Sequence, residues 1–377
     1  MALFGSKMFG SQKAGSASQP AEFACTPGHV HSATCCGRRD FLTGLAAAGA
    51  GAVLGAPKAK AQGTAPAKPF RIDVHHHFSS PGFIAEITGR RTGQAPLMRL
   101  TAQKSLEDMD KGGVATAIVS ISEPSVFFGN YDAARSLARE TNDFGARMVQ
   151  EYPGRFGLFG TVPLPDVDGT LQEIAYIYDT LKADGVCMMT DYEGKFLGDP
   201  AFTPVMEELN RRKAVVYTHP FRNACCRNLV PDVFEPTIEL GTDTTRTIAS
   251  LIFSGTAARF PDIKFIFSHG GGTAPFLVQR FTFLAKARKD IAARFPEGPL
   301  HYLQQFYYDT ANASTIYPLA SLMKMVSSSQ VVFGTDFPFL TASATAAELR
   351  ETGMFSAADL QAIDRDNAVR LLPKYKT

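Results

Sequence analysis

The chain has 377 residues, of which 45% are hydrophobic, and its 38 basic residues nearly balance its 36 acidic ones. This composition suits a protein with a sizeable buried core, and the balanced charge excludes the strong positive field that attracts nucleic acid or anionic lipid. We therefore expect a small-molecule partner, no nucleic acid and no stable membrane anchor.

Residues 1–61 have the organisation of an export signal. Arg38 and Arg39 precede a run rich in Ala, Gly and Leu, which ends at a small-residue cleavage motif, Ala59 to Ala61. The arginine pair is typical of a twin-arginine signal, and the apolar run is short and glycine-rich for a membrane span. We expect export by the twin-arginine translocase to the bacterial periplasm or the medium. The alternative is an unstructured tail that contains this pair by chance.

Residues 1–37 form a long, polar stretch ahead of the arginine pair. Its soft ligands suggest metal binding, but their spacing fits no zinc-finger pattern and they precede the cleavage motif. An incorrectly assigned start codon explains the stretch equally well. These residues are Cys25, His29, His31, Cys35 and Cys36.

Three cysteines follow the signal: Cys187, Cys225 and Cys226. An odd number argues against a disulfide framework. Cys225 and Cys226 lie close after His219, so a catalytic thiol is an alternative. No reactive-cysteine signature surrounds them, and a better catalytic set exists nearby.

Residues 62–377 alternate between strand and helix patterns, with helical periodicity over 131–152, 202–212, 244–260 and 273–295 among others. Eight apolar strands separated by amphipathic helices predict one α/β domain, a (β/α)8 TIM barrel. A doubly wound sheet is the rival, but no GxGxxG motif opens a helix. The predicted strands are 70–76, 114–122, 156–164, 185–190, 214–219, 263–269, 306–310 and 330–336.

Two connections exceed the usual two to six residues or so, namely 78–104 and 220–242. Both leave the carboxyl ends of strands, where barrel enzymes build their active sites. We expect them to be long loops that shape a substrate pocket.

His75 and His77 lie at the end of the first strand, in DVHHHF. Alternate residues of a strand face the same side, so these two imidazoles point together and His76 points away. His76 is therefore expected to be structural. A His-x-His pair alone is weak evidence for a metal, because histidines are also common as hydrogen-bonded core or surface groups.

His219 in YTHP and Asp336 in FGTDFP add two candidates at strand ends. Two or three imidazoles with one carboxylate suit Zn2+ and tolerate Mn2+. The sequence does not identify the groups that orient these rings.

His269 in FSHGGG follows a sixth predicted strand. It is either a ligand of a second metal or a free imidazole that acts as general acid or base. We favour the free role, because a second metal usually needs a bridging ligand on a middle strand and GVCMMTD offers no Lys or His. The three glycines are expected to let the backbone pass close to ligand or metal.

Taken together, DVHHHF, LEDMDKGGVATAIVS, YTHP, FSHGGGTAPF, YYDTA and FGTDFP resemble the amidohydrolase superfamily. The likeness covers about residues 70–372 and points to the branch of aminocarboxymuconate semialdehyde decarboxylase, with the 6-methylsalicylate decarboxylase type most similar. It implies a distorted barrel with one divalent metal held by His75, His77, His219 and Asp336. It further implies that His269 activates water or shuttles protons.

The resemblance also gives Arg280 a role. It matches an arginine that binds the substrate carboxylate and that the neighbouring subunit of a homodimer supplies. The alternative is a solvated helix residue. Arg222, three residues beyond a ligand, is a second candidate for orienting a substrate carboxylate.

We therefore predict a metal-dependent, non-oxidative decarboxylase of a hydroxy-aromatic or dienoic carboxylic acid, with no organic cofactor. Protonation of the substrate carbon through Asp336, or through a water held by His269, avoids an unstabilised carbanion. The alternative is a hydrolase of a lactone, ester, amide or carbon–carbon bond, because one metal site supports several reactions. Other polar residues at strand ends are expected to organise loops; they are Glu123, Asp191, Asp309 and Asn312.

Overall fold

The computed structural model describes residues 69–227 and 229–376. The predicted export signal, with its cysteines and histidines, lies outside these residues. Among the helices within them, none is long and apolar enough to cross a membrane.

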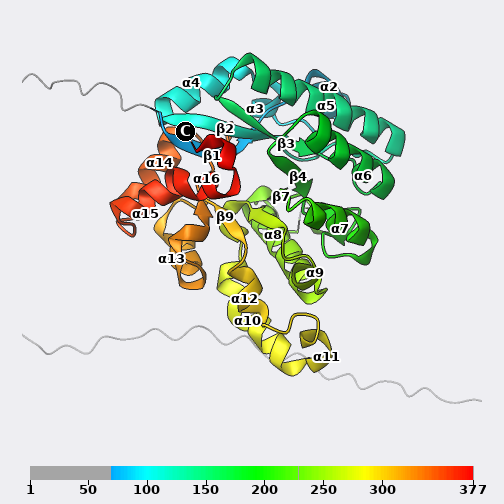
Figure 1. The fold of residues 1–377 in the computed structure, drawn as a ribbon, viewed down its shortest axis with the longest axis vertical. Helices are drawn as coiled ribbons and strands as arrows, with labels where there is room; N and C mark the ends of the chain where they lie inside the picture. Colours follow the sequence, from blue (N-terminus) through cyan, green and yellow to red (C-terminus); the bar gives the residue numbers. More distant parts are fainter. Residues whose placement is uncertain (1–68, 228, 377) are drawn as a thin grey trace, which may run out of the picture. The chain divides into compact units, whose positions relative to one another are not determined.

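Eight parallel strands form one sheet in the order β1-β2-β3-β4-β7-β8-β9-β10 (Figure 1). All eight predicted strands are present, each inside its predicted range or one residue beyond it. Their bounds are β1 (Arg71–His77), β2 (Val114–Ser120), β3 (Phe156–Thr161), β4 (Gly185–Met189), β7 (Val215–His219), β8 (Lys264–Phe267), β9 (Tyr307–Asp309) and β10 (Val331–Val332).

Hydrogen bonds between the two ends of the sheet close it into a barrel. The backbone N–H of Val74 donates to the carbonyl of Phe333 over 2.9 Å, and that of His77 donates to Phe337 over 2.9 Å. An open doubly wound sheet has no such bonds between its edges. The predicted (β/α)8 barrel is confirmed, with a short last strand that makes it irregular.

Helices follow most strands and cover the barrel (Figure 1). The longest is α5, whose N-terminus is capped by the Asn130 side chain. The helices are α2 (Pro81–Gly89), α3 (Ala95–Met98), α4 (Ala102–Gly112), α5 (Tyr131–Glu151), α6 (Val167–Ala175), α7 (Thr203–Arg211), α8 (Pro236–Phe253), α9 (Thr256–Arg259), α10 (Ala274–Ala287), α11 (Lys289–Ala292), α12 (Pro299–Leu303), α13 (Ile316–Met325), α14 (Ala342–Glu351), α15 (Ala357–Gln361) and α16 (Asn367–Leu371).

The predicted loop 78–104 is wrong, because this segment contains α2, α3 and the start of α4. Ser80 caps α2 by accepting a hydrogen bond from the N–H of Phe83, and Pro81 occupies its first turn, where a proline costs no hydrogen bond. The second connection holds a short turn at 224–226, and α8 already begins inside it, at Pro236. A small antiparallel hairpin of β5 (Asp191–Tyr192) and β6 (Lys195–Phe196) was not predicted.

Candidate metal centre

Four side chains from three separate parts of the barrel meet at the carboxyl ends of its strands. His75 and His77 come from β1, His219 ends β7, and Asp336 follows β10. All four are buried, and one ligand atom from each lies within 4.8 Å of the others. His76 points away, as expected, and stacks on Phe337.

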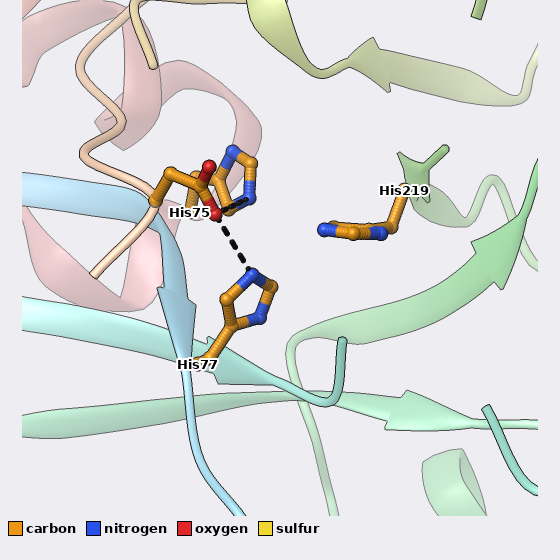
Figure 2. Close-up of side chains that lie close together, drawn as sticks. His75, His77 and His219 are labelled. Carbon is orange, nitrogen blue, oxygen red and sulfur yellow. Dashed lines mark hydrogen bonds and ion pairs between the residues drawn. The ribbon is translucent and has the colours of Figure 1, made fainter. Parts of the chain in front are cut away.

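The three imidazoles face a common space without packing flat on one another (Figure 2). Asp336 Oδ1 lies 3.2 Å from His75 Nε2 and 3.0 Å from His77 Nε2. The ring centroid of His219 lies 5.4 Å from that of His75 and 4.9 Å from that of His77. Three nitrogens and one oxygen therefore face one small volume.

Each imidazole is oriented by an acceptor at its other nitrogen. Nδ1 of His75 lies 2.8 Å from Asp309 Oδ2, Nδ1 of His77 lies 3.2 Å from the Ser120 carbonyl, and Nδ1 of His219 lies 2.8 Å from the Pro220 carbonyl. A proton on Nδ1 leaves the lone pair on Nε2, which points to the shared centre.

Charge at the cluster also fits a cation. Burial opposes protonation of His75, but the Asp309 and Asp336 carboxylates outweigh it and raise its pKa to about 10. Burial, reinforced by His77 and His75, holds the pKa of His219 well below its ordinary value. Burial alone would raise the pKa of Asp336, but His75 and His269 hold it well below its usual range.

These observations favour a divalent metal at this position. Nε2 of His75 is buried and has no hydrogen-bond partner, although it faces a carboxylate oxygen. Three imidazoles and a carboxylate are ligands that zinc and related divalent ions prefer. The residues present fit one ion.

Gly334 allows the strands that carry the ligands to approach one another closely. A side chain on this residue would place its Cβ 2.9 Å from the Cβ atoms of both His75 and Asp309. By contrast, Gly272 in the GGG run faces the backbone of Gly241, whose oxygen lies 2.0 Å from the Cβ position. Gly272 therefore packs against α8, and it also lines the cavity described below, so the predicted closeness of this run to a ligand stays a prediction.

His269 lies beside the four ligands and contacts the other oxygen of the shared carboxylate. Its Nε2 is 3.4 Å from Asp336 Oδ2, while its buried Nδ1 has no partner. Asn312 Nδ2 donates to the same oxygen over 3.0 Å. His269 and Asp336 both have positive φ, 54° and 65°, a conformation that is strained in residues with a side chain and common at functional sites.

Asp309 and Asn312 have larger roles than the loop-organising role expected from sequence. Asp309 is fully buried and accepts bonds from His75, Tyr217 and the backbone of His269. The sequence signals for Asp309 were its place at the end of β9 and its presence in the YYDTA motif. The sequence could not show that Asp309 contacts the ring of His75.

The two predicted substrate-binding arginines have different surroundings. Arg222 Nε is 2.6 Å from Oε1 of buried Glu123, and its backbone N–H donates to the same carboxylate over 3.0 Å. Burial raises the pKa of Glu123 although Arg222 opposes this. Arg280 is exposed on α10, and neither arginine lines the cavity described next.

A cavity of about 770 Å³ opens above the ligands. Its floor includes His219, His269 and Asp336, and Glu123 with Gln94 forms part of its wall. The second long connection and the first turn of α8 supply another wall, as expected of a segment that shapes a pocket.

The three cysteines are free thiols. Cys187 is buried in β4, and burial raises its pKa to about 12. Cys226 lies 3.5 Å from the Arg246 guanidinium, and neither Cys225 nor Cys226 lines the cavity with the metal cluster.

Comparison with known proteins gives three findings. The family described as Amidohydrolase matches residues 72–374. The decarboxylase yanB of Aspergillus niger is 38% identical over 81% of this chain and 88% of its own, and the 6-methylsalicylic acid decarboxylase of Penicillium expansum is 32% identical over 81% and 97%. The structure of a dihydroxybenzoic acid decarboxylase from Polaromonas, with bound manganese and 2-nitroresorcinol, superimposes with a TM-score of 0.69 at 22% identity, covering 81% of this chain and 97% of that one.

Proposed function

Because the chain belongs to the amidohydrolase family, we propose that it is a metal-dependent decarboxylase that releases CO2 from a hydroxy-aromatic acid of the 6-methylsalicylate type. The observation that carries this proposal is the buried cluster of His75, His77, His219 and Asp336 on the floor of a cavity. Two relatives that match over about four fifths of the chain support it: yanB is a decarboxylase, and the Penicillium expansum protein is a 6-methylsalicylic acid decarboxylase.

The four ligands would hold one divalent ion, which supplies positive charge beside the carboxylate and hydroxyl oxygens of the substrate. The ligand set suits Zn2+, and Mn2+ is the alternative because the Polaromonas relative binds it. Metal analysis of the purified protein distinguishes the two, and no stoichiometric metal would contradict the proposal.

Residues of the chain would deliver the proton that replaces the carboxyl group of the substrate. His269 Nε2 lies 3.4 Å from Asp336 Oδ2, so His269 is placed to supply a proton at the floor of the cavity. Transfer from His269, through Asp336 or a water, protonates the ring carbon that carries the carboxylate. The carbon–carbon bond then breaks, its electron pair returns to the ring, and CO2 leaves.

A substrate panel on metal-loaded protein tests this proposal. We expect CO2 from 6-methylsalicylate or 2,6-dihydroxybenzoate and, in D2O, one deuterium at the carbon that lost the carboxyl group. Turnover of lactones or esters, with none of the aromatic acids, would instead identify a hydrolase.

We also propose that the protein is a homodimer in which Arg280 reaches the cavity of its partner. Phe276 and Phe283 are 81% and 71% exposed on α10, three or four residues either side of Arg280, so all three share one helix face. Exposed apolar patches of this kind mark interaction surfaces. Figure 1 shows α10 and α11 extending away from the strands.

Complementation tests the shared site. Arg280→Ala and His269→Asn are each expected to be nearly inactive, but a mixed dimer rebuilds one site from the intact residue of each chain. After subunit exchange, about a quarter of the sites should be active if dimers form at random. Unchanged activity in the mixture, or a fully active monomer, would exclude a role across the interface.

Finally, we propose that residues 1–61 direct export by the twin-arginine translocase and are then removed. The support is the order of Arg38, Arg39, the apolar run and Ala61 in the sequence. N-terminal sequencing of protein from the periplasm should find Gln62 first. Replacing both arginines by lysine should retain the protein in the cytoplasm, and unchanged export would contradict the proposal.

A further inference from the structure

The cavity above the metal ligands is larger than a small hydroxybenzoate requires. A methyl-substituted hydroxybenzoate has about 11 non-hydrogen atoms and takes up roughly 330 Å³ if each counts as much as a water molecule. The cavity holds about 770 Å³. In a single chain, more than half of this space is therefore left over when such an acid is bound.

Part of the cavity lining is apolar. Leu240 on the first turns of α8 and Phe339 after β10 are partly buried, and the Phe339 ring lies 6.1 Å from that of His77. Towards the mouth, Phe234 and Ile238 are 69% and 45% exposed. Apolar side chains thus line the cavity both beside the metal cluster and towards solvent, together with Pro236 and Pro318.

Charge in the cavity is confined to the floor and one wall. His219, His269 and Asp336 form the floor, and the only other ionisable side chain among the lining residues is Glu123. Glu123 is already paired with Arg222 over 2.6 Å and accepts a long hydrogen bond from Gln94 over 3.4 Å. Among the lining residues that one chain supplies in the described part of the structure, none is a Lys or Arg that could receive a second carboxylate or a phosphate.

From this arrangement we propose that the natural substrate carries an apolar extension, an alkyl or aryl group of several carbons, that lies along Leu240, Ile238 and Phe234. We call this extension of the substrate the apolar arm. The inference rests on the proposed function, which supplies the reacting end of the substrate. Each methylene that leaves water for this lining should strengthen binding about threefold to fourfold.

Binding of product analogues tests the apolar arm independently of turnover. Decarboxylation of either a 4-alkyl or a 6-alkyl 2-hydroxybenzoate yields a 3-alkylphenol, so one series covers both positions. Calorimetry with full-length, metal-loaded protein should find 3-pentylphenol at least tenfold tighter than 3-methylphenol. Equal or weaker binding of the longer phenol would overturn the inference.

Variants of the lining residues test where the apolar arm of the substrate binds. Ile238→Ala and Leu240→Ala should reduce the gain from chain length severalfold and leave 3-methylphenol binding within about twofold. Leu300→Ala is the matched control, because Leu300 is 40% exposed on α12 and does not line the cavity. An equal loss in the control, or none in either lining variant, would contradict the assignment.

Turnover of the matching acids separates this inference from the proposed function. Faster kcat/KM for 2-hydroxy-6-pentylbenzoate than for 6-methylsalicylate supports both. Tighter phenol binding with no CO2 from any acid supports the arm and refutes the decarboxylase. CO2 from 6-methylsalicylate, with no gain in binding or kcat/KM from the longer chain, supports the decarboxylase and refutes the arm.

Discussion

Asp309 connects a metal ligand with the proposed proton donor. It is fully buried and accepts a 2.8 Å bond from the ring of His75 and another of 2.8 Å from the backbone N–H of His269. Because carboxylates that orient metal-bound imidazoles tune affinity, Asp309→Asn should weaken metal binding about 10- to 100-fold. Metal retained after dialysis measures this.

Tyr217→Phe is the control for Asp309. It removes a single 3.1 Å bond to the same carboxylate and leaves the contacts to both histidines. We expect little change in metal content in this variant. A metal affinity in Asp309→Asn equal to that of the wild type would show that the Asp309 charge is not needed.

His269 is predicted to act on protons and not to hold the metal. Its φ of 54° favours asparagine as the replacement, since asparagine tolerates the left-handed region. His269→Asn should lower kcat about 10²- to 10⁴-fold and keep one metal per chain. Kinetics and metal analysis of the same preparation measure both quantities.

A variant of a predicted metal ligand distinguishes the two possible roles of His269. His219→Asn removes one of the four clustered ligand groups and should lose the metal together with activity. Loss of the metal in His269→Asn as well would make His269 a ligand.

The sequence was sufficient to predict the role of residues that depend on their position in a strand. It was not sufficient to predict the role of residues that depend on contacts across the barrel. Alternation along β1 predicted that His75 and His77 point together. Nothing in a sequence shows that Asp309, 234 positions away, reaches the ring of His75. For the same reason the role of Asn312 beside Asp336 could not be predicted.

At the scale of elements, closure between β10 and β1 fixes the distance between ligand strands. Gly334 occupies this seam, where an added Cβ would lie 2.9 Å from those of His75 and Asp309. Gly334→Ala should therefore cost about 1–3 kcal/mol of unfolding free energy and weaken metal binding. Denaturant unfolding and metal titration measure the two effects.

Gly89, at the end of α2, is the matched glycine. Its Cβ position has no neighbour within 4 Å and its φ is not positive, so Gly89→Ala should be neutral or slightly stabilising. If Gly334→Ala and Gly89→Ala have the same effect on unfolding free energy and metal binding, the close contacts at Gly334 are not the reason that this position requires a glycine.

The helices α2 and α3 show why the loop prediction failed. The segment 78–104 contains Gly and Pro residues, which resemble loop signals when read without their positions. In the structure Pro81 stands in the first turn of α2, where it favours a helix. The strands were easier to predict, because short apolar runs bounded by turn residues are typical of strands that are buried on both faces.

On α7, Glu208 joins two arginines, and its charge should make stability depend on pH. Its hydrogen bond to Arg211, followed by that to Arg212, lowers its pKa to about 2. A depressed pKa in the folded state means that the stabilisation is complete above the ordinary value of 4.5 and is lost as the pH falls towards 2. Since the side chain is 22% exposed, screening reduces the effect, and Glu208→Gln should cost roughly 0.5–1 kcal/mol at neutral pH.

Urea unfolding at pH 7 and at successively lower pH checks this prediction. The difference between wild type and Glu208→Gln should narrow as the solution is acidified. The control is Asp290→Asn on α11, which breaks an exposed pair with Arg288 and should change nothing measurable. A difference that widens in acid would contradict the assigned sign.

For the whole molecule, the metal is expected to stabilise a barrel that folds without it. The barrel closes through backbone hydrogen bonds, such as that from Val74 N–H to the Phe333 carbonyl, which use none of the four ligand side chains. The ion should therefore add to the stability of the fold and not create it. At 100 times its dissociation constant, the ion adds about 2.7 kcal/mol, or roughly 5–10 °C in Tm.

Calorimetry before and after chelation, and again after the ion is restored, measures this shift. His269→Asn should show the same shift, because it keeps all four ligands, whereas Asp336→Asn should show little. Unfolding of the chelated protein at room temperature would mean that the ion is required for the fold. An unchanged Tm would mean that the four side chains do not hold it, because an ion bound only to the folded state must stabilise that state.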